Sequence, residues 1–133
     1  GDYMIVSRLK ISYVPQDCSH IIGDMDDFIC SYHVDITLVK TILRKLGFSR
    51  LHFERRLEEL SEGQKKKMMI AISLATSAHL YIWDEPLNYI DIFSRIQIEK
   101  LILEYQPTLL FVEHDTFFQE SIATKIIDFD ELI

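Results

Sequence analysis

A capped helix start near the middle of the chain constrains the fold more than any other stretch. Ser61 is followed three residues later by Gln64, which is the spacing of a capping box. In that motif the hydroxyl accepts from the Gln64 backbone N–H, and the amide side chain reaches back to the cap. Met68 and Ile72 then recur at helical spacing, so we predict a helix that runs to about Ser77.

Gly63 lies in the first turn of this predicted helix. A glycine there lowers helix stability by roughly 1 kcal/mol relative to alanine. Glycine is nevertheless useful where another group must approach the backbone closely. A helix N-terminus without bulky side chains offers free N–H groups and the positive end of the helix dipole, and both favour phosphate. This end of the helix is therefore a candidate phosphate site, and an ordinary capped helix is the alternative.

Two apolar stretches in the second half of the chain end in ionisable residues. Leu80 to Trp83 predicts a buried strand that delivers Asp84 and Glu85 to its carboxyl end, and Thr108 to Val112 predicts another, followed by His114. Strands that alternate with helices predict a parallel sheet, with its ligand site beyond the carboxyl ends of the strands.

The first half divides into a strand and a helical block. Residues 4–14 predict a strand that Pro15 stops, with Gln16 directly after it. From 18 to 60 the pattern is helical: Asp35 is a candidate N-cap and Gly47 a candidate C′ residue.

Three further expectations concern smaller segments. We predict a short helical piece from Phe53 to Leu60, and a solvated turn, rather than a metal site, at Asp24, Asp26 and Asp27. Further helices are predicted around Ile98–Tyr105 and Thr116–Ala123, and a last strand at 125–129.

Composition excludes several classes of protein. The net charge of −7 argues against a surface that grips nucleic acid, which needs a basic patch. No apolar stretch approaches the roughly 20 residues that span a bilayer. We expect no secretory leader, because the first residues lack a basic stretch followed by an apolar one. With only two cysteines, reduced thiols in a cytoplasmic protein are the expectation.

Three motifs, LSEGQ, LYIWDEP and VEHD, occur in this order. Together they resemble the signature, Walker B and H-loop motifs of the ATP-binding cassette (ABC) superfamily, and LYIWDEPLNYIDIFSR most resembles the ABC-F branch, in particular the antibiotic-resistance proteins that act on the ribosome. The resemblance implies an α/β fold: a partial P-loop NTPase-like parallel sheet with an inserted helical subdomain. Residues 1–17 would lead to the Q-loop, 18–60 would form the helical subdomain, and 61–133 would complete the core.

The resemblance also implies catalytic roles. Asp84 would be the Walker B aspartate that holds Mg²⁺, and Glu85 would be the general base that polarises the attacking water. His114 would contact the γ-phosphate of ATP, and Gln16, as the Q-loop glutamine, would reach both the magnesium and the water.

A second cassette is implied as a partner. Ser61, Gly63 and Gln64 would close over the γ-phosphate of ATP held by that cassette, and Asn88 to Asp91 match the D-loop, which runs along it. Glu62 stands where glycine is commoner in the signature.

One departure from the family is large. A Walker A loop, G-x-x-x-x-G-K-[ST], cradles the phosphates, but none of the four glycines here is followed by lysine. The chain looks like the C-terminal part of a nucleotide-binding domain, from the second of two in an ABC-F protein. Alone, it should show negligible ATPase activity, and an uncovered apolar sheet should favour oligomers, strand exchange or marginal stability.

Three functions follow from these observations. The preferred one is a fragment of a ribosome-directed ABC-F ATPase, whose longer protein would displace drugs such as lincosamides, streptogramins or pleuromutilins. The alternatives are the ATP-binding subunit of an ABC membrane transporter and a non-catalytic, cassette-derived binding module that has lost its P-loop.

Overall fold

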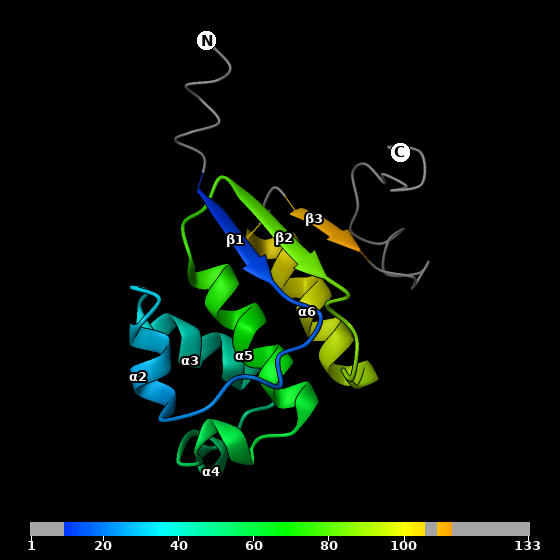
Figure 1. Ribbon diagram of the computed structural model, residues 1–133. Coiled ribbons are helices and arrows are strands. Elements are labelled where there is room, and N and C mark those ends of the chain that lie inside the picture. The colour runs from blue at the N-terminus through cyan, green and yellow to red at the C-terminus, as the bar shows by residue number, and fades with distance from the viewer. Residues whose placement is uncertain (1–9, 106–108, 113–133) are drawn as a thin grey trace.

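A three-stranded parallel sheet forms one end of the structure, a computed structural model that describes residues 10–105 and, by their backbone, 109–112. The strands are β1 (Ile11–Val14), β2 (Leu80–Asp84) and β3 (Leu109–Val112), in the order β1-β2-β3. Val14 pairs with Trp83, and Asp84 with Val112, so the carboxyl ends of all three strands meet at one edge (Figure 1). The predicted parallel sheet is confirmed.

The helix expected at the signature is α5 (Glu62–Ala75). Its capping box is confirmed: Gln64 N–H donates to Ser61 Oγ at 3.2 Å, and Ser61 N–H donates to Gln64 Oε1 at 2.9 Å. In Figure 1, α5 runs from the small helices to the back of the sheet, and α6 (Ile92–Tyr105) passes behind β2. Most of α5 is buried, because it packs on helices at one end and on the sheet at the other.

The segment between β1 and α5 is helical, as predicted. It contains α2 (Met25–Cys30), α3 (Ile36–Lys45), α4 (Arg50–Phe53) and the 3₁₀ turn η1 (Leu57–Glu59). Asp35 caps α3 by accepting from the N–H groups of Thr37 and Leu38, and Gly47 follows its end with φ +96°. Both local signals in this block are therefore confirmed.

The predicted helical piece from Phe53 to Leu60 is confirmed only in part, as the 3₁₀ turn η1 over Leu57–Glu59. The α-helical turn lies earlier, at Arg50–Phe53, between the N-cap Ser49 and the C-cap Glu54. Ser49 N–H donates to His52 Nδ1 at 2.9 Å. Beyond this turn, Leu57 N–H donates to Gly23 O at 2.9 Å, and the Glu58 carboxylate accepts from Gly23 N–H at 3.0 Å. These bonds to the loop before α2 hold the segment in place of a continuous helix.

Asp24, Asp26 and Asp27 are exposed to solvent, as predicted, but they begin a helix and do not form a turn. Asp24 is the N-cap of α2 and accepts from Asp27 N–H at 3.1 Å. Asp26 pairs with Lys40 of α3 at 2.9 Å. Acidic side chains in a first turn are favoured by the helix dipole, which explains why the cluster is helical.

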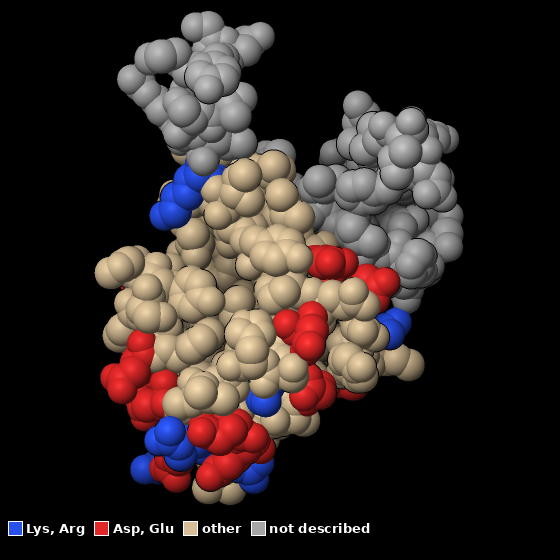
Figure 2. Space-filling view, viewed as in Figure 1, with Lys and Arg blue, Asp and Glu red and all other residues tan. Residues whose placement is uncertain are grey.

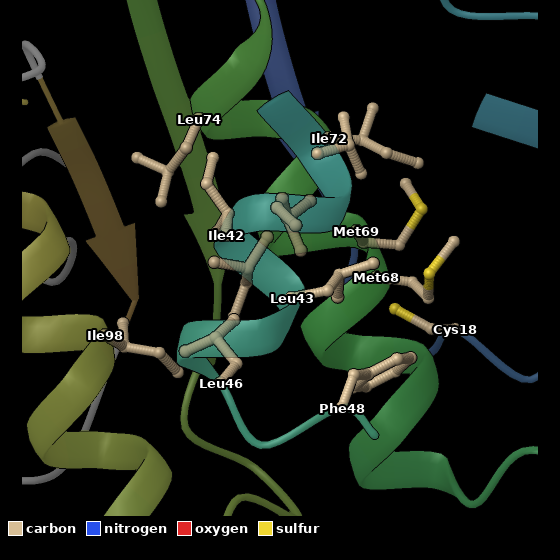
Figure 3. Packing of buried hydrophobic residues seen from close by; sticks show 14 of the residues in the cluster. Cys18, Ile42, Leu43, Leu46, Phe48, Met68, Met69, Ile72, Leu74 and Ile98 are labelled. Carbon is tan, nitrogen blue, oxygen red and sulfur yellow. The ribbon is translucent and has the colours of Figure 1, made fainter. Parts of the chain in front are cut away.

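The core lies between α3, α5 and the sheet. Figure 3 shows Ile42, Leu43 and Leu46 of α3 facing the α5 side chains, with Cys18 beside Met68. Under the sheet, Trp83 Nε1 donates to Ser73 Oγ at 2.9 Å, and Ser12 Oγ lies 2.6 Å from the same oxygen. A buried hydroxyl of α5 thus joins β1 and β2.

The other face of β1 is open. Ile11 and Tyr13 are 50% and 53% exposed, whereas the alternate residues Ser12 and Val14 are buried. Figure 2 shows that the surface over β1 and β2 carries mostly uncharged side chains. The oligomer expected from an uncovered sheet stays a prediction. Among the helices of the described residues, none combines the length and apolar composition needed to cross a membrane.

Candidate functional site

Gln16 and Glu85 meet where β1 and β2 end. Gln16 Nε2 donates to Glu85 Oε2 at 3.1 Å, although the residues are 69 positions apart. The parallel register brings them together, since Val14 pairs with Trp83 and Gln16 and Glu85 each lie two residues further along the chain, just beyond the strand ends. Two side chains that the family resemblance assigns to the same water therefore lie in contact.

Glu85 stands in an unusual backbone conformation. Its φ is +45°, in the left-handed region that residues with a Cβ rarely occupy. Asn88 N–H donates to Glu85 O at 3.1 Å and closes the turn that follows. Such outliers cluster at functional sites, where the surrounding structure holds them, so the conformation supports a specific role for this carboxylate.

Asp84, the last residue of β2, lies beside this pair and is half-buried. Gln16 uses its amide nitrogen toward Glu85, which leaves its amide oxygen for another partner. Carboxylate and amide oxygens suit Mg²⁺, which keeps several waters and takes few protein ligands. Asp84 and Gln16 therefore offer oxygen atoms of the kind that Mg²⁺ takes. Among the described residues, no cluster of three or more His, Cys, Asp or Glu side chains could hold a metal ion.

The signature end of α5 packs against the turn that carries Asn88 and Asp91. A Cβ at Gly63 would lie less than 3.0 Å from the carbonyl oxygen of Tyr89, a separation that real side chains essentially never show. Tyr89 itself has φ +66°. The group that approaches this glycine in the structure is thus a carbonyl of the same chain, a reason for glycine that is independent of phosphate.

Asp91 ties the same turn to α5 and α6. Its carboxylate accepts from Ser94 N–H at 2.9 Å, as an N-cap of α6, and lies 3.2 Å from Lys67 Nζ. Burial raises the pKa of Asp91, but the hydrogen bonds from Ser94 and the Lys67 ammonium outweigh it and hold the pKa at about 2. The aspartate is therefore ionised at any physiological pH.

The structure brings the predicted residues into two groups. Gln16, Asp84 and Glu85 lie at the strand ends, and Ser61, Gly63 and Gln64 lie at the start of α5, next to the turn from Asn88 to Asp91. His114 lies outside the described residues, as do the predicted helix 116–123 and strand 125–129.

Sequence reasoning missed two lysines that link these groups. Lys67 pairs with Asp91, and Lys66 is buried against the strand ends. The signal for Lys66 was its helical spacing from Ile70 and Ser73, which places a charged residue on a buried side of α5.

Known structures with this fold define the class of protein. A solved complex of the archaeal ribosomal stalk protein aP1 with the archaeal ribosome recycling factor aABCE1 matches with a TM-score of 0.67 and 26% identity, covering 86% of this chain and 24% of the other. The fold is that of an ABC nucleotide-binding domain of the P-loop NTPase class.

The sequence comparisons agree. The profile of the family described as "ABC transporter" matches residues 3–88, and the chain belongs to this family. The ATP-binding protein Uup of Buchnera aphidicola is 28% identical over 98% of this chain and 23% of the relative. The ABC transporter F family member 5 of Arabidopsis thaliana is 31% identical over 70% of this chain and 13% of the relative. The chain thus spans less than a quarter of the length of these relatives.

Proposed function

We propose that this chain is the C-terminal part of a nucleotide-binding domain within a longer ABC-F protein, which binds ATP between two cassettes and hydrolyses it. The observation that carries this is the contact between Gln16 and Glu85 at 3.1 Å. It supports a role for both groups at one attacking water, which would lie beyond the strand ends. Phosphoryl transfer depends on such positioning, because the protein contributes little covalent chemistry.

In this proposal Glu85 is the general base. Its carboxylate accepts the proton of the water that attacks the γ-phosphate, and the Gln16 amide holds that carboxylate in orientation. Asp84 and the amide oxygen of Gln16 would hold Mg²⁺, which neutralises phosphate charge when bound. His114 would contact the γ-phosphate.

The start of α5 would bind the ATP of the partner cassette. Ser61 Oγ accepts from Gln64 N–H in the capping box and keeps its own proton to donate to a phosphate oxygen. The N–H of Gly63 faces the same end of the helix, where the dipole favours anions. Asn88 and Asp91 would run along the partner as the D-loop.

A ribosomal target and antibiotic resistance are the finer part of the proposal. They are supported by the F-family relative, by the ribosome recycling factor in a complex of related fold, and by the resemblance of LYIWDEPLNYIDIFSR to resistance proteins. We propose a cytoplasmic protein that displaces ribosome-bound drugs. Expression of the longer protein should raise the inhibitory concentration of such a drug. Unchanged drug sensitivity would refute the proposed role in antibiotic resistance.

The test of the ATPase uses the longer protein that contains this chain. Glu85→Gln keeps the size of the side chain but removes the base, so turnover should fall at least about 100-fold while ATP binding persists. Glu104→Gln changes an exposed carboxylate of α6, away from both groups of site residues, and is the matched control. Full activity of the Glu85→Gln variant would refute the assignment. The 133-residue chain alone should show negligible turnover, because it contains no Walker A loop.

A further inference from the structure

Lys66 of α5 is a buried lysine whose ammonium donates its hydrogen bonds to backbone carbonyls. Its side chain is 1% exposed. The ammonium nitrogen lies 2.8 Å from Pro15 O, 2.7 Å from Gln16 O and 3.4 Å from Asp84 O. An ammonium has three N–H donors, so the three carbonyls match its full donor set.

Such an arrangement is costly to build. A charge taken out of water is tolerated only where hydrogen bonds replace its hydration, and an aliphatic residue would fill this part of α5 without that cost. Burial lowers the pKa of Lys66, whereas Cys18, Asp84, Glu85 and Asp17 raise it. The retained charge therefore needs a reason beyond filling space.

The three carbonyls belong to the two strand ends that form the candidate site. Pro15 and Gln16 follow β1, and the Gln16 side chain is the one that reaches Glu85. The Asp84 carbonyl is part of the peptide bond between Asp84 and Glu85. Glu85 itself has φ +45°, and the backbone turns there. One ammonium thus holds the backbone on both sides of the Gln16–Glu85 contact.

We propose that Lys66 is a positioning residue, which clamps the carboxyl ends of β1 and β2 so that Gln16 and Glu85 stay in contact. The part of this inference that concerns catalysis rests on the proposed function, since it assumes that these two side chains act on one water. The same helix begins with Ser61 and Gly63. A displacement of the N-terminal end of α5, where phosphate would bind, would therefore move the backbone of Gln16 through the hydrogen bonds of Lys66.

The test compares Lys66→Gln with Lys65→Gln in the 133-residue chain. Lys65 is the matched control, because it is the neighbouring lysine, is 7% exposed and has one carbonyl acceptor, Ser19 O at 3.4 Å, away from the strand ends. The readout is the NMR order parameter of the Gln16 side-chain amide, recorded where both variants are folded.

Lys66→Gln should lower this order parameter below about 0.6, the range of flexible groups, and Lys65→Gln should leave it at the wild-type value. An unchanged Gln16 amide in Lys66→Gln, or an equal loss in both variants, would overturn the proposal.

A measurement on the unaltered chain covers the case in which Lys66→Gln does not fold. The ¹H–¹⁵N signal of the Lys66 ammonium should be visible through slow proton exchange, with couplings across hydrogen bonds to the carbonyl carbons of Pro15 and Gln16. An ammonium that exchanges as fast as an exposed lysine would overturn the clamp.

Turnover in the longer protein separates this proposal from the proposed function. Lys66→Gln should lower kcat about tenfold with KM for ATP within twofold, Lys66→Arg should restore part of kcat, and Lys65→Gln should match wild type. An unchanged kcat in Lys66→Gln would overturn the positioning role. If the wild-type protein hydrolyses no ATP, the proposed function fails, whereas the Gln16 amide still decides whether the clamp exists.

Discussion

Replacement of Gly63 by alanine should destabilise the chain, against the ordinary rule for helices. Helix propensity alone predicts that Gly63→Ala stabilises by up to about 1 kcal/mol. In the structure, however, the new Cβ would lie less than 3.0 Å from the Tyr89 carbonyl oxygen. The sign of the effect therefore separates local propensity from tertiary packing.

The magnitude follows from how firmly the carbonyl is held. Tyr89 has φ +66°, and its turn is closed by Asn88 N–H to Glu85 O and Ile90 N–H to Leu87 O, both at 3.1 Å. The turn cannot rotate its carbonyl away without losing these bonds. Overpacking against a fixed group costs about 1–3 kcal/mol, and the propensity gain offsets part of that, so we expect a net loss of about 1–2 kcal/mol.

Urea denaturation at 25 °C measures the change, with the midpoint falling and the m-value unchanged. Lys100→Ala, at an exposed position in the interior of α6, is the control and should change stability by no more than about 0.5 kcal/mol. In a Tyr89→Gly background the turn can relax, because glycine tolerates positive φ. The cost of Gly63→Ala should then shrink by at least about 0.5 kcal/mol, as coupled neighbours show. A neutral or stabilising Gly63→Ala would refute this reasoning.

Three other predictions test the core, the acid range and the thiols. Ser73→Ala should cost about 2–3 kcal/mol in urea denaturation, because it leaves the buried indole N–H of Trp83 without its acceptor; a cost under about 0.5 kcal/mol would contradict this. The pKa of Asp91 is lowered to about 2 in the folded chain. The ionised carboxylate therefore contributes to the free energy of unfolding above its unfolded pKa of about 3.9, and this contribution is lost as the pH falls toward 2. Because its side chain is 57% exposed, Asp91→Asn should cost only about 1 kcal/mol at pH 7, and the difference from wild type should shrink between pH 4 and pH 2; a difference that grows there would have the wrong sign. Iodoacetamide should label exposed Cys30 at least about tenfold faster than Cys18, which is buried and whose pKa burial raises; equal rates by mass spectrometry would contradict the packing around Cys18.

Local signals in the sequence were sufficient where the interacting groups are close in the chain. Three local features are present as predicted: the capping box of Ser61 and Gln64, the Asp35 cap and the glycine that follows α3. Each depends on hydrogen bonds between residues only two to four positions apart. The strand at Leu80–Asp84 was also predictable, since a short apolar stretch between helices has few other places in an α/β fold.

Long-range contacts decided what those signals could not. The 3₁₀ turn before α5 replaced the predicted helix because Leu57 and Glu58 bond to Gly23. The neighbour of Gly63, a carbonyl 26 positions further on, was equally invisible in the sequence.

The sequence by itself thus determined the motifs, their order and the class of fold. Only the tertiary structure decided which carbonyls surround Lys66, and that Gln16 reaches Glu85. The physical reason is that the parallel register and the packing of α5 bring together groups 18 to 69 positions apart, and no periodicity along the chain specifies how such distant strand ends align.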